Sequence, residues 1–358
     1  MKKVLFVISS LRGGGAERVL SVLANELSTY SNLEISILLL DNCSQAYTLD
    51  SNVKLLTLKK KKTNWTKIGR TLSLIKSIRK SIDSYDPDIV IPFMTETSIL
   101  VYLAIKGSYP QIASEHGVFR DRGTIINWLR SFVFKRINHI VCLNHHDYNE
   151  LRKLNKNVSI IHNPSHFKAP SINNKEREAY VICVGSLDRY EEKGIHILVG
   201  IWQAIVKEAP NFKLHILGGG NEANQQQLQS LIADLGLQSS VILEGFQDDL
   251  SPWYKKAEML ISASEMESFS MILVEAQSMG CPIISFDCPY GPAEIINNNI
   301  DGILVPNQDL EKLTKAILYL HSNDKVRSDL SNNGLINSKR FDKDVIAKKW
   351  AELINDII

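Results

Sequence analysis

Two glutamates eight positions apart, Glu267 and Glu275, are the side chains in this sequence best suited to chemistry. Eight residues at about 100° each would bring both carboxylates near one face of a helix. We predict that helix over Phe269–Met279, with Glu267 just before its start and Glu275 well inside it, ended by Gly280 and Pro282. A carboxylate pair around a helix N-terminus suits a ligand with hydroxyl groups at two ends and a phosphate between them. Two solvated glutamates on a surface helix are the alternative.

A glycine-rich segment between the first predicted strand and the first predicted helix is a second candidate. Gly14 and Gly15 would let backbone N–H groups approach an anion at the helix N-terminus. The segment does not match the dinucleotide fingerprint Gly-x-Gly-x-x-Gly, because Arg18 stands where the third glycine would be. A simple turn that needs positive φ angles is the alternative.

Several other polar or aromatic residues directly follow predicted strands. His116 could hydrogen-bond a substrate hydroxyl or a phosphate through a neutral imidazole. Lys193, with Arg189 as a second candidate, could offset phosphate charge. Phe246 could form the wall of a base pocket. A structural histidine and a solvated lysine are the corresponding alternatives.

Metal and disulfide chemistry is not indicated. The five cysteines are scattered and include no Cys-x-x-Cys, which favours a reducing compartment and no structural zinc. Asp86-Pro87-Asp88 has the form of a metal-binding Asp-x-Asp, but Asp88 leads directly into the apolar run Ile89–Ile91. We interpret it as a helix-to-strand turn and predict a chain without metal or cofactor.

Short apolar strands alternate with amphipathic helices, which predicts parallel sheets covered by helices. With 358 residues the chain exceeds one hydrophobic core, so two domains are expected, at 1–169 and 170–342. The polar stretch 170–178 is the predicted linker. The predicted strands are 4–9, 33–40, 88–92, 111–114, 139–143, 159–162, 180–184, 213–217, 241–244, 259–262 and 282–286. The predicted helices are 16–27, 68–82, 195–208, 225–235, 251–256, 269–279, 310–322 and 343–358.

Charge is distributed unevenly along the chain. Residues 1–165 carry a net charge of +10 and residues 166–358 a net charge of −8. Lys59–Lys62, the helix at 68–82 and the segment 122–136 combine basic and aromatic or aliphatic residues, a pattern typical of helices that lie on anionic lipid. Helices that bury one face in the protein are the alternative. No apolar run is long enough to span a membrane, and the basic residues accompany no nucleic-acid-binding motif.

Taken together, these motifs resemble the retaining, nucleotide-sugar-dependent glycosyltransferases of family four, over essentially the whole chain. The resemblance implies the GT-B fold, an α/β architecture of two Rossmann-like, doubly wound parallel-sheet domains that face a cleft. It also implies that the helix at 343–358 packs back onto the first domain. The glycine-rich start, the histidine, the Gly-x-Leu…Lys-Gly loop and the two glutamates occur in the family's order.

The resemblance also implies roles for individual residues. Glu275 would bind the ribose hydroxyls, Glu267 would lie by the donor sugar, and Lys193 would hold the diphosphate. His116 would contact the sugar near the reacting carbon, and it joins Glu267 and Lys193 as the predicted catalytic set. The remaining predicted donor-binding residues are Gly14, Gly15, Ser186, Arg189, Phe246, Phe269, Ser270, Met271 and Ile272.

One residue departs from the family's pattern. Family members have arginine where this chain has Ser186, and serine cannot neutralise a phosphate; Arg189 or Arg18 are the candidates to compensate. Two rival functions therefore stay open: a nucleotide-sugar epimerase with the same architecture, and a catalytically silent partner subunit. Analysis of the products formed without acceptor would distinguish an epimerase from a transferase. A failure to bind any nucleotide would favour the silent subunit.

The loop Pro289–Ile296 is similar to one in family members that use UDP-sugars in bacterial glycan assembly. We therefore expect a UDP-linked hexose or N-acetylhexosamine as donor, with no metal requirement and with retention of the anomeric configuration. The expected acceptor is a glycan or a polyprenyl-diphosphate-linked sugar. The expected location is cytoplasmic, in peripheral contact with the inner face of the membrane, and no nucleic-acid partner is expected.

Overall fold

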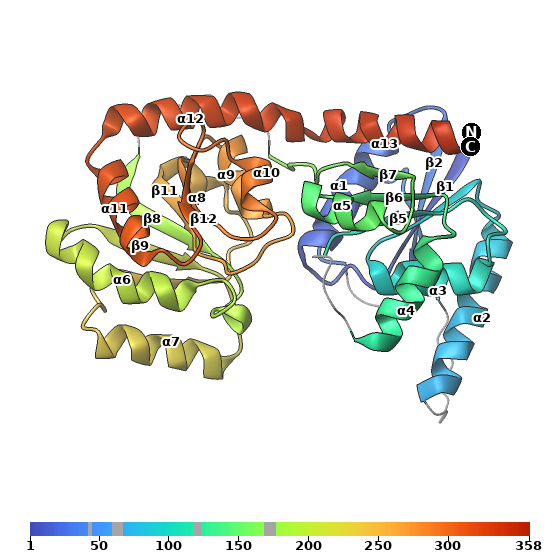
Figure 1. Ribbon diagram of the computed structural model, residues 1–358, viewed down its shortest axis with the longest axis horizontal. Helices are drawn as coiled ribbons and strands as arrows, with labels where there is room; N and C mark the ends of the chain where they lie inside the picture. Colours follow the sequence, from blue (N-terminus) through green and yellow to red (C-terminus); the bar gives the residue numbers. More distant parts are fainter. Residues whose placement is uncertain (42–44, 59–66, 118–122, 168–176) are drawn as a thin grey trace. The chain divides into compact units, whose positions relative to one another are not determined.

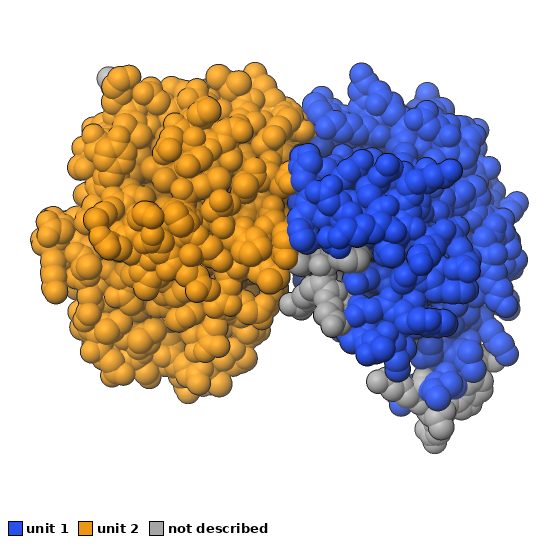
Figure 2. Space-filling view, in the orientation of Figure 1, with its two compact units in different colours: residues 1–164, 343–358 blue, residues 165–342 orange. Residues whose placement is uncertain are grey.

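The computed structural model describes residues 1–41, 45–58, 67–117, 123–167 and 177–358. They form two compact units, coloured separately in Figure 2. Unit 1 comprises Met1–Pro164 and Lys343–Ile358, and unit 2 comprises Ser165–Asp342. The boundary thus falls at Pro164 rather than at residue 169. Most of the predicted linker lies in 168–176, outside the described residues.

Parallel strands in the spatial order β3-β2-β1-β4 form the first sheet of unit 1. Parallel bridges from Val90 to Gln111 and from Phe93 to Ser114 continue this order into a second sheet, β5-β6-β7. The strands are β1 Lys2–Ile8, β2 Leu33–Leu39, β3 Lys54–Thr57, β4 Ile89–Pro92, β5 Ile112–Ser114, β6 His139–Cys142 and β7 Val158–Ile160. Strands β1 and β4 are almost entirely buried, as continuous apolar runs in a covered parallel sheet should be.

Helices from both ends of the chain accompany these strands (Figure 1). They are α1 Gly15–Leu27, α2 Lys67–Tyr85, α3 Thr95–Ile105, α4 Thr124–Phe134, α5 His145–Arg152 and α13 Lys343–Ile357. Helix α13 packs against α1, where the Lys343 Nζ lies 2.6 Å from the Glu26 Oε2. The last helix therefore belongs to unit 1 although all of unit 2 precedes it in the sequence.

Unit 2 contains one six-stranded parallel sheet in the order β10-β9-β8-β11-β12-β13. The strands are β8 Glu178–Val184, β9 Lys213–Leu217, β10 Val241–Gly245, β11 Ala257–Ser262, β12 Ile283–Asp287 and β13 Ile303–Pro306. The helices are α6 Ile195–Glu208, α7 Glu222–Asp234, α8 Ser251–Lys256, α9 Met271–Ser278, α10 Pro292–Ile295, α11 Leu310–His321 and α12 Asp324–Ser338. This strand order is that of a doubly wound fold, so the direction of winding reverses between β8 and β11.

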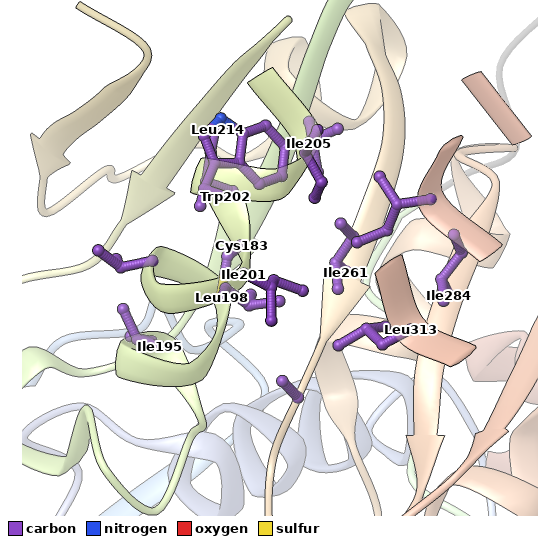
Figure 3. Close-up of a cluster of buried hydrophobic side chains, with 14 of the residues drawn as sticks. Cys183, Ile195, Leu198, Ile201, Trp202, Ile205, Leu214, Ile261, Ile284 and Leu313 are labelled. Atoms are coloured by element: carbon purple, nitrogen blue, oxygen red, sulfur yellow. The ribbon is translucent and has the colours of Figure 1, made fainter. Parts of the chain in front are cut away.

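The core of unit 2 lies between its sheet and helices α6 and α11 (Figure 3). Leu198 and Trp202 of α6 and Leu313 of α11 meet Ile261 and Ile284 of the sheet, and none of the five has exposed surface. Burying a large apolar side chain contributes about 1.5–3 kcal/mol to stability. This core fixes the carboxyl ends of β8 and β11, which carry several predicted site residues.

Most predicted elements are confirmed, several with the same bounds, including α6, α8 and β9. Asp86-Pro87-Asp88 is the predicted helix-to-strand turn, because Asp86 has a left-handed φ of 52° and the Asp88 Oδ2 accepts a bond of 2.6 Å from the Lys3 N–H. The cysteines of the described residues, Cys142, Cys183, Cys281 and Cys288, are buried and form no disulfide with one another; Cys43 lies outside them.

One prediction about the two glutamates is wrong. Helix α9 begins only at Met271, and Ser270 before it has an extended backbone with φ −86° and ψ 104°. Glu267 precedes the helix, as predicted, but its backbone forms an isolated parallel bridge with Tyr290 and does not continue the helical geometry. Helical spacing therefore does not relate Glu267 to Glu275, and each is positioned by different neighbours.

Candidate active site at the carboxyl ends of the strands

An ion pair between Lys193 and Glu267 lies at the carboxyl ends of the strands of unit 2. Lys193 follows β8 and Glu267 follows β11, the two strands between which the winding reverses. The Lys193 Nζ lies 2.5 Å from the Glu267 Oε1, and the Ser264 hydroxyl donates to the same oxygen at 3.0 Å. Both charged side chains are mostly buried, so water screens their interaction less than at a free surface. In open α/β sheets, ligands bind at this reversal, outside the carboxyl ends of the strands.

Three loops at this edge of the sheet pack backbone against backbone. A Cβ on Gly218, which follows β9, would lie 1.8 Å from the carbonyl oxygen of Gly185, which follows β8. A Cβ on Gly194 would lie 1.9 Å from the carbonyl oxygen of Ala263, and Gly194 has a φ of +65°. Side chains are thus excluded at both contacts, and the loops that carry Lys193 and Glu267 are held close together.

The close approach at Gly218 predicts a large loss of stability in Gly218→Ala. We expect the free energy of unfolding to fall by about 3 kcal/mol, because the new methyl group meets backbone that cannot rotate away. Gly200→Ala is the matched control. A Cβ at Gly200, within α6, meets nothing within 4 Å, and alanine favours a helix over glycine by about 1 kcal/mol. Urea unfolding should show opposite shifts of midpoint; equal stability of the two variants would contradict the packing described.

Helix α9 places its N-terminus after the Glu267 segment. Phe269 and Ser270 precede the helix, and Met271 and Ile272 form its start. The Ser270 side chain makes no capping hydrogen bond. Backbone N–H groups at a helix start carry partial positive charge and suit a phosphate. The chain thus brings a lysine and a helix N-terminus to the loops after β8 and β11.

Glu275 lies within α9 and is almost fully buried. The hydroxyl of Tyr254, itself buried on α8, donates to the Glu275 Oε2 at 3.0 Å. The His166 Nδ1 lies 3.6 Å from the Glu275 Oε1. Glu275 is therefore positioned by α8 and by the segment that leads into unit 2, whereas Glu267 is positioned by Lys193 and Ser264.

Ser186 and Arg189 are used locally. The Ser186 Oγ accepts a bond of 3.3 Å from the Asp188 N–H. Arg189 pairs with Glu192 at 2.6 Å, and the carboxylate of Glu192 raises the pKa of the Arg189 guanidinium. The other candidate for compensation, Arg18, lies over the ring of Tyr47 in unit 1. Of the two cations predicted in unit 2, Lys193 therefore pairs with Glu267, whereas Arg189 pairs with Glu192.

The other predicted donor residue of unit 2, Phe246, follows β10 with a side chain that is 73% exposed. It lies against the loop after β9, because a Cβ on Gly219 would meet the Phe246 Cβ at 3.3 Å. An exposed aromatic ring at this edge is free to stack on a flat ligand group.

His116 of unit 1 follows β5 and is held by its neighbours. Its ring stacks on Phe93 with centroids 4.5 Å apart and an angle of 15°. The Ser114 Oγ lies 2.8 Å from the His116 Nε2. Burial lowers the pKa of His116 to about 4, and a hydrogen bond with the Asn163 side chain partly opposes this shift. The imidazole is therefore neutral at pH 7.

The lowered pKa of His116 predicts a pH-dependent stability. The unfolded chain has an ordinary histidine pKa of 6.5 at this position, so between pH 6.5 and about 4 it binds a proton that the folded chain does not. Stability should fall with decreasing pH in this window, by about 3 kcal/mol in all. His116→Asn should lose this component, so the stability difference between wild type and variant should change between pH 7 and pH 4.5. A constant difference in urea unfolding would contradict the assignment.

In the glycine-rich segment of unit 1, Gly14 is the residue before α1. The Gly14 N–H donates to the Tyr47 hydroxyl at 3.1 Å. Its φ of 170° is extended and open to any residue, so the left-handed angle of the segment falls on Gly13 at 130°. A Cβ on Gly15 would meet nothing within 4 Å, so the fold alone does not require glycine there.

Sequence reasoning missed three residues of these sites. Ser264, three positions before Glu267, could have been noticed as a polar residue directly after a strand. Tyr254 gave no signal, because a buried tyrosine on a short helix looks like core. The third missed residue is Asp188. Its Oδ1 accepts bonds of 2.7 and 2.6 Å from the backbone N–H and the side-chain amide of Asn221, and these bonds tie the loops after β8 and β9 together.

The fold defines a class of protein with two doubly wound α/β units, each built on parallel strands. The profile described as "Glycosyltransferase Family 4" matches residues 13–165, and that described as "Glycosyl transferases group 1" matches residues 178–323. These matches, the relatives below and the similarity to solved GT-B structures identify the chain as a GT4-like glycosyltransferase.

Curated relatives match the chain along its whole length. The amylovoran biosynthesis glycosyltransferase AmsD of Erwinia amylovora is 26% identical over 99% of this chain and 100% of its own. An α-1,4-N-acetyl-D-galactosaminyltransferase of Campylobacter jejuni, named for a glycan linked to undecaprenol through a diphosphate, is 27% identical over 100% of this chain and 99% of its own. The structure of Anabaena HepE with UDP and glucose superposes with a TM-score of 0.81 at 18% identity, covering 99% and 100% of the two chains.

Proposed function

We propose that this protein is a retaining glycosyltransferase that moves a hexose or N-acetylhexosamine from a UDP-sugar to a glycan or lipid-linked acceptor. The observation that carries the proposal is the Lys193–Glu267 pair at 2.5 Å, at the reversal of winding where such folds bind their ligands. The relatives support the same class of reaction, because their names describe a glycosyltransferase of amylovoran biosynthesis and an N-acetylgalactosaminyltransferase named for an undecaprenol-linked glycan. HepE in complex with UDP and glucose supports UDP as the donor base.

Each residue has a defined part in this proposal. The Lys193 ammonium and the first-turn amides of α9 stabilise the negative charge that develops on the departing diphosphate. Glu267 lies beside the transferred sugar and holds Lys193 in place, and Glu275 binds the ribose hydroxyls. Ser186 contacts the diphosphate as a neutral hydrogen-bond partner. These groups take the part that a metal ion plays in other transferases, and so we propose a metal-independent reaction.

His116 is the proposed contact for the sugar near the reacting carbon. Because its imidazole is neutral at pH 7, it can hydrogen-bond a sugar hydroxyl without adding positive charge next to an oxocarbenium-like carbon. The acceptor hydroxyl attacks from the face that the diphosphate leaves, and a phosphate oxygen of the leaving group takes its proton. The sugar therefore keeps its anomeric configuration.

A transfer assay tests this function. The purified protein is first screened for thermal stabilisation by UDP, GDP and their hexose and N-acetylhexosamine conjugates, and then assayed with polyprenyl-diphosphate-linked acceptors. We expect stabilisation by UDP conjugates, transfer in EDTA, and an α-linked product from an α-linked donor by NMR. Sugar conversion without acceptor would show an epimerase, and binding of no nucleotide would show a silent subunit.

We also propose that unit 1 contacts an anionic membrane on its cytoplasmic side, where a lipid-linked acceptor would lie. Helix α4 exposes Ile125, Trp128 and Phe132 at spacings of three and four residues, which form one apolar stripe. Ile68 and Leu72 of α2 are exposed one turn apart. Unit 1 has a net charge of +10, because its first segment carries +10 and the three basic residues of Lys343–Ile358 are balanced by three acidic ones. Lys59–Lys62 lie outside the described residues. Among the residues that the structure describes, no helix is long and apolar enough to cross a bilayer.

Vesicle flotation tests the membrane contact. We expect wild type to float with vesicles that contain anionic lipid, less so at high salt, and Trp128→Glu to lose most of this binding. Ile336→Glu is the matched control, since Ile336 is equally exposed but lies on α12 of unit 2. Failure of wild type to float at low salt would rule the contact out.

A further inference from the structure

Two residues of the described chain have backbone angles that bulky side chains rarely adopt. Tyr290 has a φ of 90° and Met94 a φ of 76°. The other described non-glycine residues with positive φ lie between 51° and 62°: Asp86, Lys106, Asn299 and Gln308. Those values are close to the left-handed helical minimum, which residues in turns reach at small cost. An aromatic residue at 90° is strained by about 1–3 kcal/mol, and glycine at the same position would not be.

The strained tyrosine lies directly beside the charged pair. Tyr290 follows β12 and forms a parallel bridge with Glu267. At the next position, a Cβ on Gly291 would lie 2.8 Å from the Glu267 carbonyl oxygen and 3.1 Å from its Cβ. The loop after β12 is therefore packed on the backbone of Glu267, whose carboxylate contacts Lys193 at 2.5 Å.

Packing of the hydrophobic core does not account for the tyrosine. The Tyr290 side chain is only half-buried and is not part of the buried cluster that forms the core of unit 2. Strained residues persist where the surrounding structure holds them, and they cluster at ligand-binding positions. An aromatic ring offers an apolar face to the C–H groups of a sugar and, in tyrosine, a hydroxyl to its oxygens.

We propose that Tyr290 contacts the transferred sugar of the donor and helps to select it, with its ring against the carbon face of the sugar. The inference rests on the proposed function, since it names the residue that recognises the sugar part of the same donor. The backbone strain is retained because glycine, which would relieve it, cannot supply this contact.

Four variants test the role of Tyr290. Tyr290→Gly and Tyr290→Asn remove the ring but tolerate positive φ, Tyr290→Phe keeps the ring, and Gln308→Gly relieves a positive φ of 62° in the loop after β13. Calorimetry measures the affinity of each for UDP and for the UDP-sugar that most stabilises wild type among UDP-glucose, UDP-galactose and their N-acetylamino forms. Thermal unfolding is measured in parallel.

We expect Tyr290→Gly and Tyr290→Asn to bind that UDP-sugar about 5- to 10-fold more weakly. Their affinity for UDP should be unchanged and their melting temperature equal or higher. Tyr290→Phe and Gln308→Gly should bind like wild type. A Tyr290→Gly variant that keeps full affinity for the UDP-sugar, or that loses UDP and UDP-sugar affinity equally, overturns the proposal. If wild type binds none of the four UDP-sugars, that result contradicts the proposed function itself, and the inference about Tyr290 is then also wrong.

Discussion

Replacing Lys193 with alanine should lower kcat for sugar transfer by about 100- to 1,000-fold, the usual loss when one electrostatic stabiliser of a developing charge is removed. Lys193 is the cation that faces Glu267 at 2.5 Å, and Ser186, in the same segment between β8 and α6, is neutral. The departing diphosphate would then rely on the N–H groups of α9 alone. Initial rates at saturating donor measure the effect.

Three further variants separate the causes of that loss. Lys256→Ala is the control, because Lys256 is exposed and paired with Glu178, and kcat should stay within about threefold of wild type. Lys193→Ala also leaves the Glu267 carboxylate without its cationic partner, so Glu267→Gln and Lys193→Ala/Glu267→Gln complete a double-mutant cycle. A Lys193→Ala enzyme within fivefold of wild type would remove Lys193 from the proposed machinery.

Replacing Glu275 with alanine should weaken UDP binding by about 10- to 100-fold, since hydrogen bonds from ligand hydroxyls to a carboxylate contribute about 1.5–3 kcal/mol. Glu275 is buried and oriented by the Tyr254 hydroxyl at 3.0 Å, so little side-chain entropy is lost when a ribose binds. Calorimetric titration with UDP measures the loss.

The ribose itself provides the control for this prediction. UDP that lacks the 2′- and 3′-hydroxyl groups should bind wild type and Glu275→Ala with similar affinity, because the contact is absent in both cases. Glu275→Gln keeps an acceptor for Tyr254 and so separates loss of charge from loss of packing. Unchanged UDP affinity in Glu275→Ala would falsify the ribose assignment.

Much of the fold could be predicted because buried parallel strands are short apolar runs separated by amphipathic helices. The elements that were not predicted lack such a signal. Helix α3 is apolar on most sides, α12 is polar on most sides, and β3 is short and half-exposed. In each case the contacts with other elements, and not the local pattern, decide the structure.

The composition of the site could be predicted better than its geometry. Lys193 was recognised because its loop follows a strand, and Glu267 because it lies eight positions before Glu275. The contact between Lys193 and Glu267 spans 74 residues and depends on β8 lying next to β11 in the sheet. Strand order is set by long-range packing, which no local motif encodes. The helical argument failed at Glu267 for the same reason, since its extended backbone is held by the loop that contains Tyr290.

The position of α13 has a consequence for biosynthesis. The Lys2 Nζ contacts the Asn355 Oδ1 across 353 positions of sequence, and Lys343 pairs with Glu26. The two ends of unit 2 are meanwhile joined to each other, because the Ser165 N–H donates to the Phe341 carbonyl at 2.7 Å. Domains generally fold as they leave the ribosome, the N-terminal one first. Here unit 1 can be completed only after all of unit 2 has been made, because α13 follows unit 2 in the chain.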